Sequence, residues 1–261
     1  MSEVTCEVAD GVATITLVRP EVLNSFNRPM ARRLQQALDA AAGEDGIRAV
    51  LLTGAGRAFC AGQDLAEAMP PDDSPAPPIE TIVRESYNPI VRRLREIEKP
   101  VVCAVNGVAA GAGANIALAC DFVLVAEQAS FVQAFSKIGL IPDSGGTFLL
   151  PRLVGLARAT ALTMLGEKLT AADALALGLI YRVVPGESLL EEARTLARRL
   201  AAMPTRGLGL TKRALNAGLT NDLATQLEVE AELQGEAGRT ADYREGVGAF
   251  LEKRAARFVG R

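Results

Sequence analysis

The chain has 261 residues, 49% of them hydrophobic and 23% charged, which is enough apolar material to bury one large core. Its net charge of −3 creates no positive field for nucleic acid or an anionic lipid surface, so we expect neither as a partner. The chain contains no histidine, which excludes Ser-His-Asp and Cys-His catalysis and zinc bound through imidazole, and we predict no metal site.

The N-terminal third alternates predicted strands and helices. Alternating apolar residues around the Asp10-Gly11 turn predict a hairpin over residues 6–19. Residues 28–44 carry apolar side chains at helical spacing, and residues 48–56 predict a buried strand that enters a glycine loop. This alternation is typical of an α/β core.

Two stretches in the middle of the chain have an unusual composition. Residues 70–78 contain five prolines in nine positions, so we expect an irregular and mobile segment there. Residues 100–120 carry no charge over 21 positions, which is long enough for a membrane span. A break at Asn106-Gly107 separates a short apolar strand from a small-residue helix, however, and this indicates a buried α/β segment. We therefore expect no membrane partner.

The remaining predicted elements continue the alternation as far as the last quarter of the chain. They are helices over residues 85–100 and 111–120, strands over 101–105 and 121–127, one helix over 148–166 and a helix-turn over 170–185.

From about residue 188 the composition shifts to Ala, Arg, Leu and Glu with little strand signal, which indicates helices. We divide the chain into a core over residues 1–197 and a helical oligomerisation portion over residues 198–261. The apolar helices either contact other subunits or pack back onto the core, and the pattern alone leaves both interpretations open.

Cysteine usage bears on the compartment. The four cysteines, Cys6, Cys60, Cys103 and Cys120, show no CxxC spacing, and no secretory leader opens the chain. A cytoplasmic location fits this pattern best, with the thiols acting as small core side chains.

The segment GLIPDSGGT, residues 139–147, places a carboxylate inside a tight turn that opens a helix. Asp and Ser are preferred at such a position because their oxygens accept hydrogen bonds from the first helical N–H groups. Helix capping is therefore one interpretation of Asp143, and catalysis is the other. Since histidine is absent, acid–base chemistry has to use a carboxylate, Lys, Tyr or Cys.

Three motifs, in order, carry a family resemblance: AFCAGQDL at residues 58–65, NGVAAGAGANIALACD at residues 106–121 and GLIPDSGGTFLLPRLVG at residues 139–155. Together they resemble the crotonase family, the enoyl-CoA hydratase/isomerase superfamily, and the likeness covers nearly the whole chain. The resemblance implies an α/β fold, a crotonase-type spiral of repeated ββα units with a helical C-terminal portion. It also implies an acyl-CoA thioester as substrate and, because coenzyme A is part of that substrate, no separate cofactor.

The resemblance also assigns roles to individual residues. Members of this family bind the thioester oxygen with two backbone N–H donors, which stabilise the enolate that forms when a proton leaves the neighbouring carbon. By position these oxyanion-hole donors are Gln63 and Ala112, and Gly62 and Gly111 let the backbone approach the thioester. CoA binding is assigned to Leu23, Arg57, Ala61, Asp64 and Leu65. It is also assigned to Phe250 and Lys253, which contact CoA in the same or a neighbouring subunit.

Departures from the family pattern bear on the reaction. Hydratases of this family use two glutamates to activate water, and the matching substrate-contacting positions here are Asn115 and Phe135. Without that pair we expect no ordinary hydratase activity. A carboxylate stands instead at Asp143, where hydratases commonly have glycine, and this favours catalysis over capping. We expect the apolar neighbours Phe135, Ile141 and Phe148 to desolvate it and strengthen it as a base.

Residues 135–155 are most similar to the branch of the family that converts ring-epoxidised phenylacetyl-CoA to the oxepin in phenylacetate degradation. This implies an acyl-CoA isomerase in which a single carboxylate moves a proton. A general Δ3,Δ2-enoyl-CoA isomerase or hydratase-like enzyme of fatty acid oxidation is the near alternative, and a non-catalytic acyl-CoA-binding protein is an alternative of another class. Because the family builds trimers that often stack as hexamers, the resemblance also implies a homotrimer or a dimer of trimers.

Overall fold

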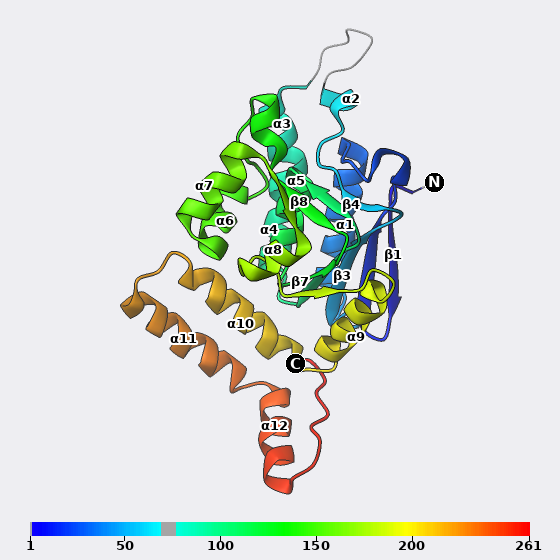
Figure 1. Ribbon diagram of the computed structural model, residues 1–261. Helices are drawn as coiled ribbons and strands as arrows, with labels where there is room; N and C mark the ends of the chain where they lie inside the picture. The colour runs from blue at the N-terminus through cyan, green and yellow to red at the C-terminus, as the bar shows by residue number, and fades with distance from the viewer. Residues whose placement is uncertain (1, 69–76) are drawn as a thin grey trace.

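The computed structural model describes residues 2–68 and 77–261, and its core contains two β-sheets (Figure 1). The larger sheet has six strands in the order β1-β2-β3-β5-β7-β10. Strands β1 and β2 form the predicted antiparallel hairpin, and each later strand runs parallel to its neighbour. The bounds of the six strands are Val4–Ala9, Val12–Leu17, Ala49–Gly54, Val101–Val105, Phe122–Ala126 and Arg182–Val184.

The smaller sheet has four short strands in the order β4-β6-β8-β9. Strands β4 (Ala58–Cys60), β6 (Val108–Ala110) and β8 (Ser130–Val132) are parallel, and β9 (Lys168–Thr170) pairs antiparallel with β8. The consecutive pairs β3–β4, β5–β6 and β7–β8 each place one strand in each sheet, and helices follow each pair. This is the repeated strand–strand–helix unit that the resemblance implies.

Helices cover the larger sheet. α1 (Arg28–Gly43) packs against β1 and β2, and α9 (Leu189–Ala201) packs across β2, β3, β5 and β7. Leu34 and Leu38 of α1 lie four residues apart and are fully buried, as expected of the apolar face of an amphipathic helix. The smaller elements are η1 (Pro20–Val22), α2 (Leu65–Ala68), α8 (Ala171–Ala176) and η3 (Ala134–Ile138).

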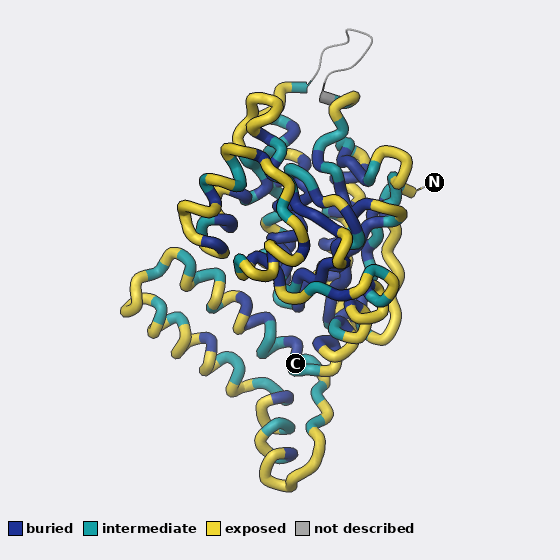
Figure 2. The backbone as a smooth tube through the Cα atoms, viewed as in Figure 1, coloured by how far each residue is buried: buried dark blue, intermediate teal, exposed yellow. Residues whose placement is uncertain are grey.

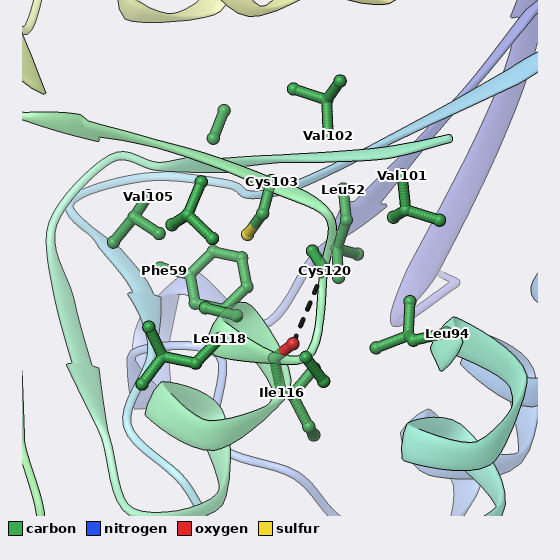
Figure 3. Packing of buried hydrophobic residues seen from close by; sticks show 14 of the residues in the cluster. Leu52, Phe59, Leu94, Val101, Val102, Cys103, Val105, Ile116, Leu118 and Cys120 are labelled. Carbon is green, nitrogen blue, oxygen red and sulfur yellow. Dashed lines mark hydrogen bonds between the residues drawn. The ribbon is translucent and has the colours of Figure 1, made fainter. Parts of the chain in front are cut away.

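The centre of the core lies where α5 (Ala112–Leu118) meets the strands (Figure 3). Every residue of α5 is buried, and a Cβ atom at Gly113 would lie 2.5 Å from the Cys60 carbonyl oxygen, so only glycine lets the helix approach β4 this closely. Cys60, Cys103 and Cys120 are buried as predicted. Cys6 is exposed, so the prediction of a core thiol is wrong there, because it lies on the edge strand β1.

Several predicted elements have different bounds in the structure. The helix predicted over residues 148–166 is two helices, α6 (Gly146–Val154) and α7 (Leu156–Leu165), because Gly155 between them has φ 79° and interrupts the helical backbone. The helix predicted over residues 85–100 begins earlier, with α3 (Ile79–Ile82) and a π-helical turn η2 (Val83–Tyr87). It continues as α4 (Asn88–Glu96).

Some features were not predicted or lie outside the described residues. Strand β10 occupies the end of the predicted helix-turn, and the short strands of the smaller sheet had no prediction, because three residues are too few to show a period. The proline-rich segment predicted over residues 70–78 lies outside the described residues, apart from its last two positions.

Three helices form the end of the chain, α10 (Thr205–Gly218), α11 (Leu223–Ala237) and α12 (Ala241–Glu252). Figure 1 shows them in yellow to red, projecting from the two sheets, with α10 and α11 packed side by side. The division between residues 197 and 198 falls inside α9 and stays a prediction. Within residues 2–68 and 77–261, no helix combines the length and apolarity that crossing a bilayer requires.

Candidate active site

The glycine loop after β4 leaves one main-chain N–H group pointing away from its neighbours. Phe26 forms a parallel bridge with Gln63, in which the Phe26 N–H donates to the Gly62 carbonyl at 2.7 Å and the Asp64 N–H donates to the Phe26 carbonyl at 2.8 Å. In a parallel bridge the central residue's own N–H points to the opposite side. The Gln63 N–H therefore faces away from Phe26.

A second N–H group without a partner lies next to the same loop. Ala112 is the first residue of α5, so its N–H has no partner within the helix. A Cβ atom built on Gly62 would lie 3.6 Å from the Ala112 nitrogen and 2.9 Å from the Ala110 carbonyl oxygen, which brings the two peptides into contact. Within the part of the chain that the structure describes, neither the Gln63 nor the Ala112 N–H has a hydrogen-bond acceptor. Both N–H groups are therefore available to an acceptor from outside the chain.

Asp143 lies in the turn before α6. The Ser144 hydroxyl donates to its Oδ1 at 2.8 Å, and the Asp143 carbonyl accepts from the Gly146 N–H at 2.8 Å. The N-cap of α6 is Gly145, and no side chain caps the helix, so the capping interpretation of the carboxylate is wrong. Burial raises the pKa of Asp143 to about 6, although the bonds from Ser144 and its own backbone N–H act in the opposite direction.

Asn115 connects the Asp143 turn to α5. It lies one turn beyond Ala112, is 1% exposed, and donates from Nδ2 to the Asp143 carbonyl at 2.9 Å. Its Oδ1 accepts from Nε2 of Gln133 at 2.8 Å. Protein groups thus bind both Nδ2 and Oδ1 of the Asn115 side chain. The amide also lies next to Gly146, where a Cβ atom would be 2.3 Å from Nδ2. This pair of amides fixes the Asp143 backbone relative to the helix that carries the Ala112 N–H.

The apolar surroundings of Asp143 differ from the prediction. Phe135 is buried, and its ring lies 3.7 Å from the position of a Cβ atom on Gly111, next to the Ala112 peptide. Ile141, however, is 79% exposed and Phe148 is 41% exposed. Of the three side chains expected to desolvate Asp143, only Phe135 is enclosed within the chain, because the turn directs Ile141 outward.

Four of the residues assigned to CoA binding lie close together. The Ala61 N–H donates to the Leu23 carbonyl at 2.9 Å, and Leu23 has a left-handed backbone with φ 55°. The Asp64 carboxylate pairs with Arg19 at 2.9 Å, while Leu65 is 58% exposed. The structure thus collects Leu23, Ala61, Asp64 and Leu65 at the loop that also carries Gln63.

The other three assigned residues lie apart from this group. Arg57 is exposed in the turn between β3 and β4. Phe250 is 83% exposed near the end of α12, and Lys253 follows that helix with φ 54°. Figure 1 shows α12, which carries Phe250, projecting from the sheets. The contact of Phe250 and Lys253 with CoA, from the same or a neighbouring subunit, stays a prediction.

Sequence reasoning did not single out Tyr87, Gln133 or Glu67 as functional residues. Tyr87 is 1% exposed, and its hydroxyl donates to the side-chain oxygen of Gln63. In the sequence it occupies one apolar position of a predicted amphipathic helix, which gives no signal for a polar role. A tyrosine hydroxyl inside a core usually has a partner, and that is the only clue the sequence could have offered.

Comparison with known proteins identifies the family. The family model described as enoyl-CoA hydratase/isomerase matches residues 7–261. The chain belongs to this family, the crotonase family. It is therefore an acyl-CoA isomerase or hydratase of that family, with an acyl-CoA substrate, and the predicted fold is confirmed.

The relatives include proteins named for both kinds of reaction. The 1,2-epoxyphenylacetyl-CoA isomerase of Escherichia coli K12 is 54% identical over 261 residues, covering 100% of each chain. A Rhodobacter capsulatus protein that carries an enoyl-CoA hydratase name is 49% identical over 255 residues, covering 98% of this chain and 97% of its own. The crystal structure of an enoyl-CoA hydratase from Bacillus anthracis superposes with a TM-score of 0.91 at 35% identity, covering 99% of this chain and 100% of that one.

Proposed function

We propose that the chain is an acyl-CoA isomerase in which Asp143 is the catalytic base. The main support is the half-buried carboxylate of Asp143, whose backbone is hydrogen-bonded through Asn115 to α5. This helix carries the N–H of Ala112, which, like that of Gln63, has no acceptor among the described residues. Where the hydratases of the family have two glutamates, this chain has the amide of Asn115 and the ring of Phe135. Delivery of water across a double bond needs paired acid–base groups, whereas one base is enough to move a proton.

In the proposed reaction the thioester oxygen accepts hydrogen bonds from the N–H groups of Gln63 and Ala112. Ionised Asp143 removes a proton from the carbon beside the carbonyl, and the electron pair of that C–H bond moves toward the thioester oxygen as an enolate. The two donors stabilise the negative charge. Protonated Asp143 then returns the proton to a carbon further along the conjugated system, which restores the carbonyl and the carboxylate. Atoms and charge balance without water or a cofactor.

For the acyl group we propose ring-1,2-epoxyphenylacetyl-CoA, with the oxepin-CoA as product. The ring C–C bond shared with the epoxide breaks and its electron pair joins the two ring double bonds to give the seven-membered oxepin, and the proton moved by Asp143 completes the isomerisation. The 54% identity to an epoxyphenylacetyl-CoA isomerase over the full length supports this substrate. The buried ring of Phe135 beside Gly111 supports it independently, because an aromatic face can pack against a cyclic acyl group next to the thioester. Isomerisation of a Δ3-enoyl-CoA would use the same proton transfer and is the second substrate class to test.

A substrate panel tests the proposed function. The protein is incubated with crotonyl-CoA, Δ3-enoyl-CoAs and the ring-epoxide CoA ester, and products are identified by mass and ultraviolet spectrum. We expect products of unchanged mass, formed fastest from the ring epoxide, and negligible hydration of crotonyl-CoA. Rapid formation of 3-hydroxybutyryl-CoA, which carries the added mass of one water, would contradict the isomerase proposal.

We further propose a trimer or a dimer of trimers that completes the CoA site. The loop residues Leu23, Ala61, Asp64 and Leu65 would contact the CoA moiety, Arg57 would meet a phosphate group, and Phe250 and Lys253 would come from a neighbouring subunit. Light scattering at micromolar concentration should give three or six times the 27.5 kDa chain mass. A mass of one chain under the same conditions would rule out this assembly.

A further inference from the structure

Protein groups contact both ends of the Gln63 side-chain amide. The Tyr87 hydroxyl donates to Oε1, while Nε2 donates to the Glu67 carboxylate at 3.2 Å and to the Asp64 carbonyl at 3.2 Å. A carboxylate and a carbonyl accept hydrogen bonds but do not donate them, so Nε2 has to face them and Oε1 has to face the hydroxyl. The network therefore permits one orientation of this amide.

The Glu67 carboxylate is held by a hydrogen bond from the first residue of α1. Its two carboxylate oxygens accept from the Arg28 N–H at 3.0 and 3.2 Å. Arg28 is the first residue of a helix of 16 residues, where the N–H groups have no partner inside the helix. The Nε2 side of the Gln63 amide is thus connected through Glu67 to a rigid element of the core.

Tyr87 approaches the amide from the opposite side. It ends the π-helical turn η2, where the i to i+5 spacing brings it onto the same buried face as Ile82. Its ring packs edge-on against Phe26, with centroids 6.0 Å apart and an interplanar angle of 74°. Phe26 is the residue whose backbone bridges Gln63, so Tyr87 contacts both the side chain of Gln63 and the ring of its bridging partner.

The Tyr87 hydroxyl is a donor and not a base. Burial raises the pKa of Tyr87 far above its ordinary value, and the negative charge of Asp143 adds to the effect. The hydroxyl therefore keeps its proton at every pH at which the enzyme is expected to work. Its single proton is used by Gln63 Oε1, which leaves none for a substrate.

We propose that Tyr87 is a positioning residue that orients the main-chain N–H of Gln63 for the thioester oxygen by fixing the Gln63 side chain. This inference rests on the proposed function, because it assumes that this N–H stabilises the enolate. The Phe26 bridge holds the Gln63 backbone, and the side-chain amide, bound between Tyr87 and Glu67, attaches the same residue a second time. Loss of the hydroxyl releases the Oε1 end of the amide, leaves only the contacts of Nε2, and lets the peptide tilt.

A double-mutant cycle in kcat tests this role. Tyr87→Phe removes the hydroxyl while keeping the ring, and Gln63→Leu removes the amide while keeping the main-chain N–H. Misplacing a catalytic group slightly can cost up to about a hundredfold in rate, so we expect each single variant to lose about 10- to 100-fold in kcat with KM changed little. Because both changes release the same contact, the double variant should be no slower than the slower single variant. The matched control is Tyr181→Phe, whose hydroxyl has one hydrogen-bond contact among the described residues, at 3.4 Å with Arg182.

The outcomes separate this inference from the proposed function. A Tyr87→Phe enzyme within twofold of the parent kcat, or one in which only KM rises, would overturn the positioning role. Losses that multiply in the double variant would also overturn it, since Tyr87 would then act independently of Gln63. If Asp143→Asn abolishes turnover while the Tyr87 cycle shows no coupling, the proposed function stands and only this inference fails. If Asp143→Asn keeps full turnover, the proposed function fails, whatever the cycle gives.

Discussion

The sheet core and the C-terminal helices bury their apolar side chains to very different extents (Figure 2). Every residue of β3 and β5 is buried, whereas α11 buries only Leu233. Leu223 and Leu227 of α11 are 75% and 53% exposed. Further exposed apolar side chains on α10 and α12 are Leu215, Tyr243, Val247, Phe250 and Leu251.

Polar contacts attach the C-terminal helices to the core. The Arg48 guanidinium donates to the Thr205 hydroxyl at 2.9 Å, the Met203 carbonyl at 2.6 Å and the Phe258 carbonyl at 3.0 Å. Lys212 pairs with Asp121 at 2.7 Å. Directional bonds can place a helix while its apolar face stays exposed, and the proposed trimer would use that face. The core is therefore expected to determine the chemistry, and the C-terminal helices the docking and assembly.

Asp143→Asn should give the largest effect of the proposed changes. It should lower turnover, which depends on the core, and not assembly, which depends on the C-terminal helices. The variant keeps the shape of the side chain but removes the basic oxygen, so we expect turnover to fall by roughly 10²–10⁴ with little change in CoA-ester binding. Steady-state kinetics and ester titrations measure both, with Asp45→Asn, at an exposed position, as the control.

Thermal stability of the same variant provides an independent check. The folded pKa of Asp143 is raised, so its ionisation disfavours the native state above about pH 6, and this cost is absent below the unfolded pKa of about 4. Melting at pH 8 should therefore show Asp143→Asn to be at least as stable as the parent, with no such gain at pH 4. A loss of stability at pH 8 would contradict the burial of this carboxylate.

Gly111→Ala should have the next largest effect. Gly111 has φ 51° and ψ −125°, a conformation that costs an L residue of order 1–3 kcal/mol, and relaxation of this strain would shift the Ala112 N–H. Loss of one oxyanion donor typically costs about 10²–10³ in rate, which sets the upper range for the fall in kcat. The control is Gly178→Ala, where φ is 76° and no atom of residues 2–68 or 77–261 lies within 4 Å of an added Cβ. Equal kcat values for the two variants would mean that the Ala112 N–H is not a donor.

Asp242→Asn should have a smaller effect, on stability rather than on chemistry. Asp242 is 2% exposed and accepts from the N–H groups of Val259 and Gly260 at 2.6 and 2.7 Å, which folds the last residues back along α12. Loss of one hydrogen bond to a charged group should lower the free energy of unfolding by about 1.5–3 kcal/mol. Denaturant unfolding measures this, and Asp222→Asn is the control, because Asn also caps helices well. If Asp242→Asn changed kcat more than stability, the division of roles between core and C-terminal helices would be wrong.

The fold could be predicted from the sequence where apolar residues repeat over enough positions to show a strand or helix period. The hairpin at Asp10-Gly11, α1 and the buried strands β3, β5 and β7 follow from such patterns. The three-residue strands of the smaller sheet do not, because their position depends on pairing with distant strands. Gly155 was visible in the sequence, yet its role as a helix break depends on a backbone angle that only the structure gives.

The site was predictable in part, through the family resemblance. That resemblance pointed to Gln63, Ala112 and Asp143. In the structure Gly62, which precedes Gln63, lies against the Ala112 nitrogen, and the roles of all three residues stay predictions. Local sequence could not reveal the contact of Tyr87 with Gln63, because the two residues come from different elements and meet only after folding. Nor could it reveal that Ile141 points outward, since residue type does not fix the direction of a side chain in a turn.

The central claim, that ionised Asp143 is the base, is tested most directly by the pH dependence of kcat/KM. Only the carboxylate form accepts a proton, so activity is present above the folded pKa and is lost as the pH falls through it. Burial raises that pKa to about 6, and we therefore expect kcat/KM for the preferred substrate of the panel to be half-maximal near pH 6. The residual activity of Asp143→Asn should lose this midpoint. A profile that is flat from pH 5 to pH 8, or a midpoint near pH 6 that persists in Asp143→Asn, would contradict the claim.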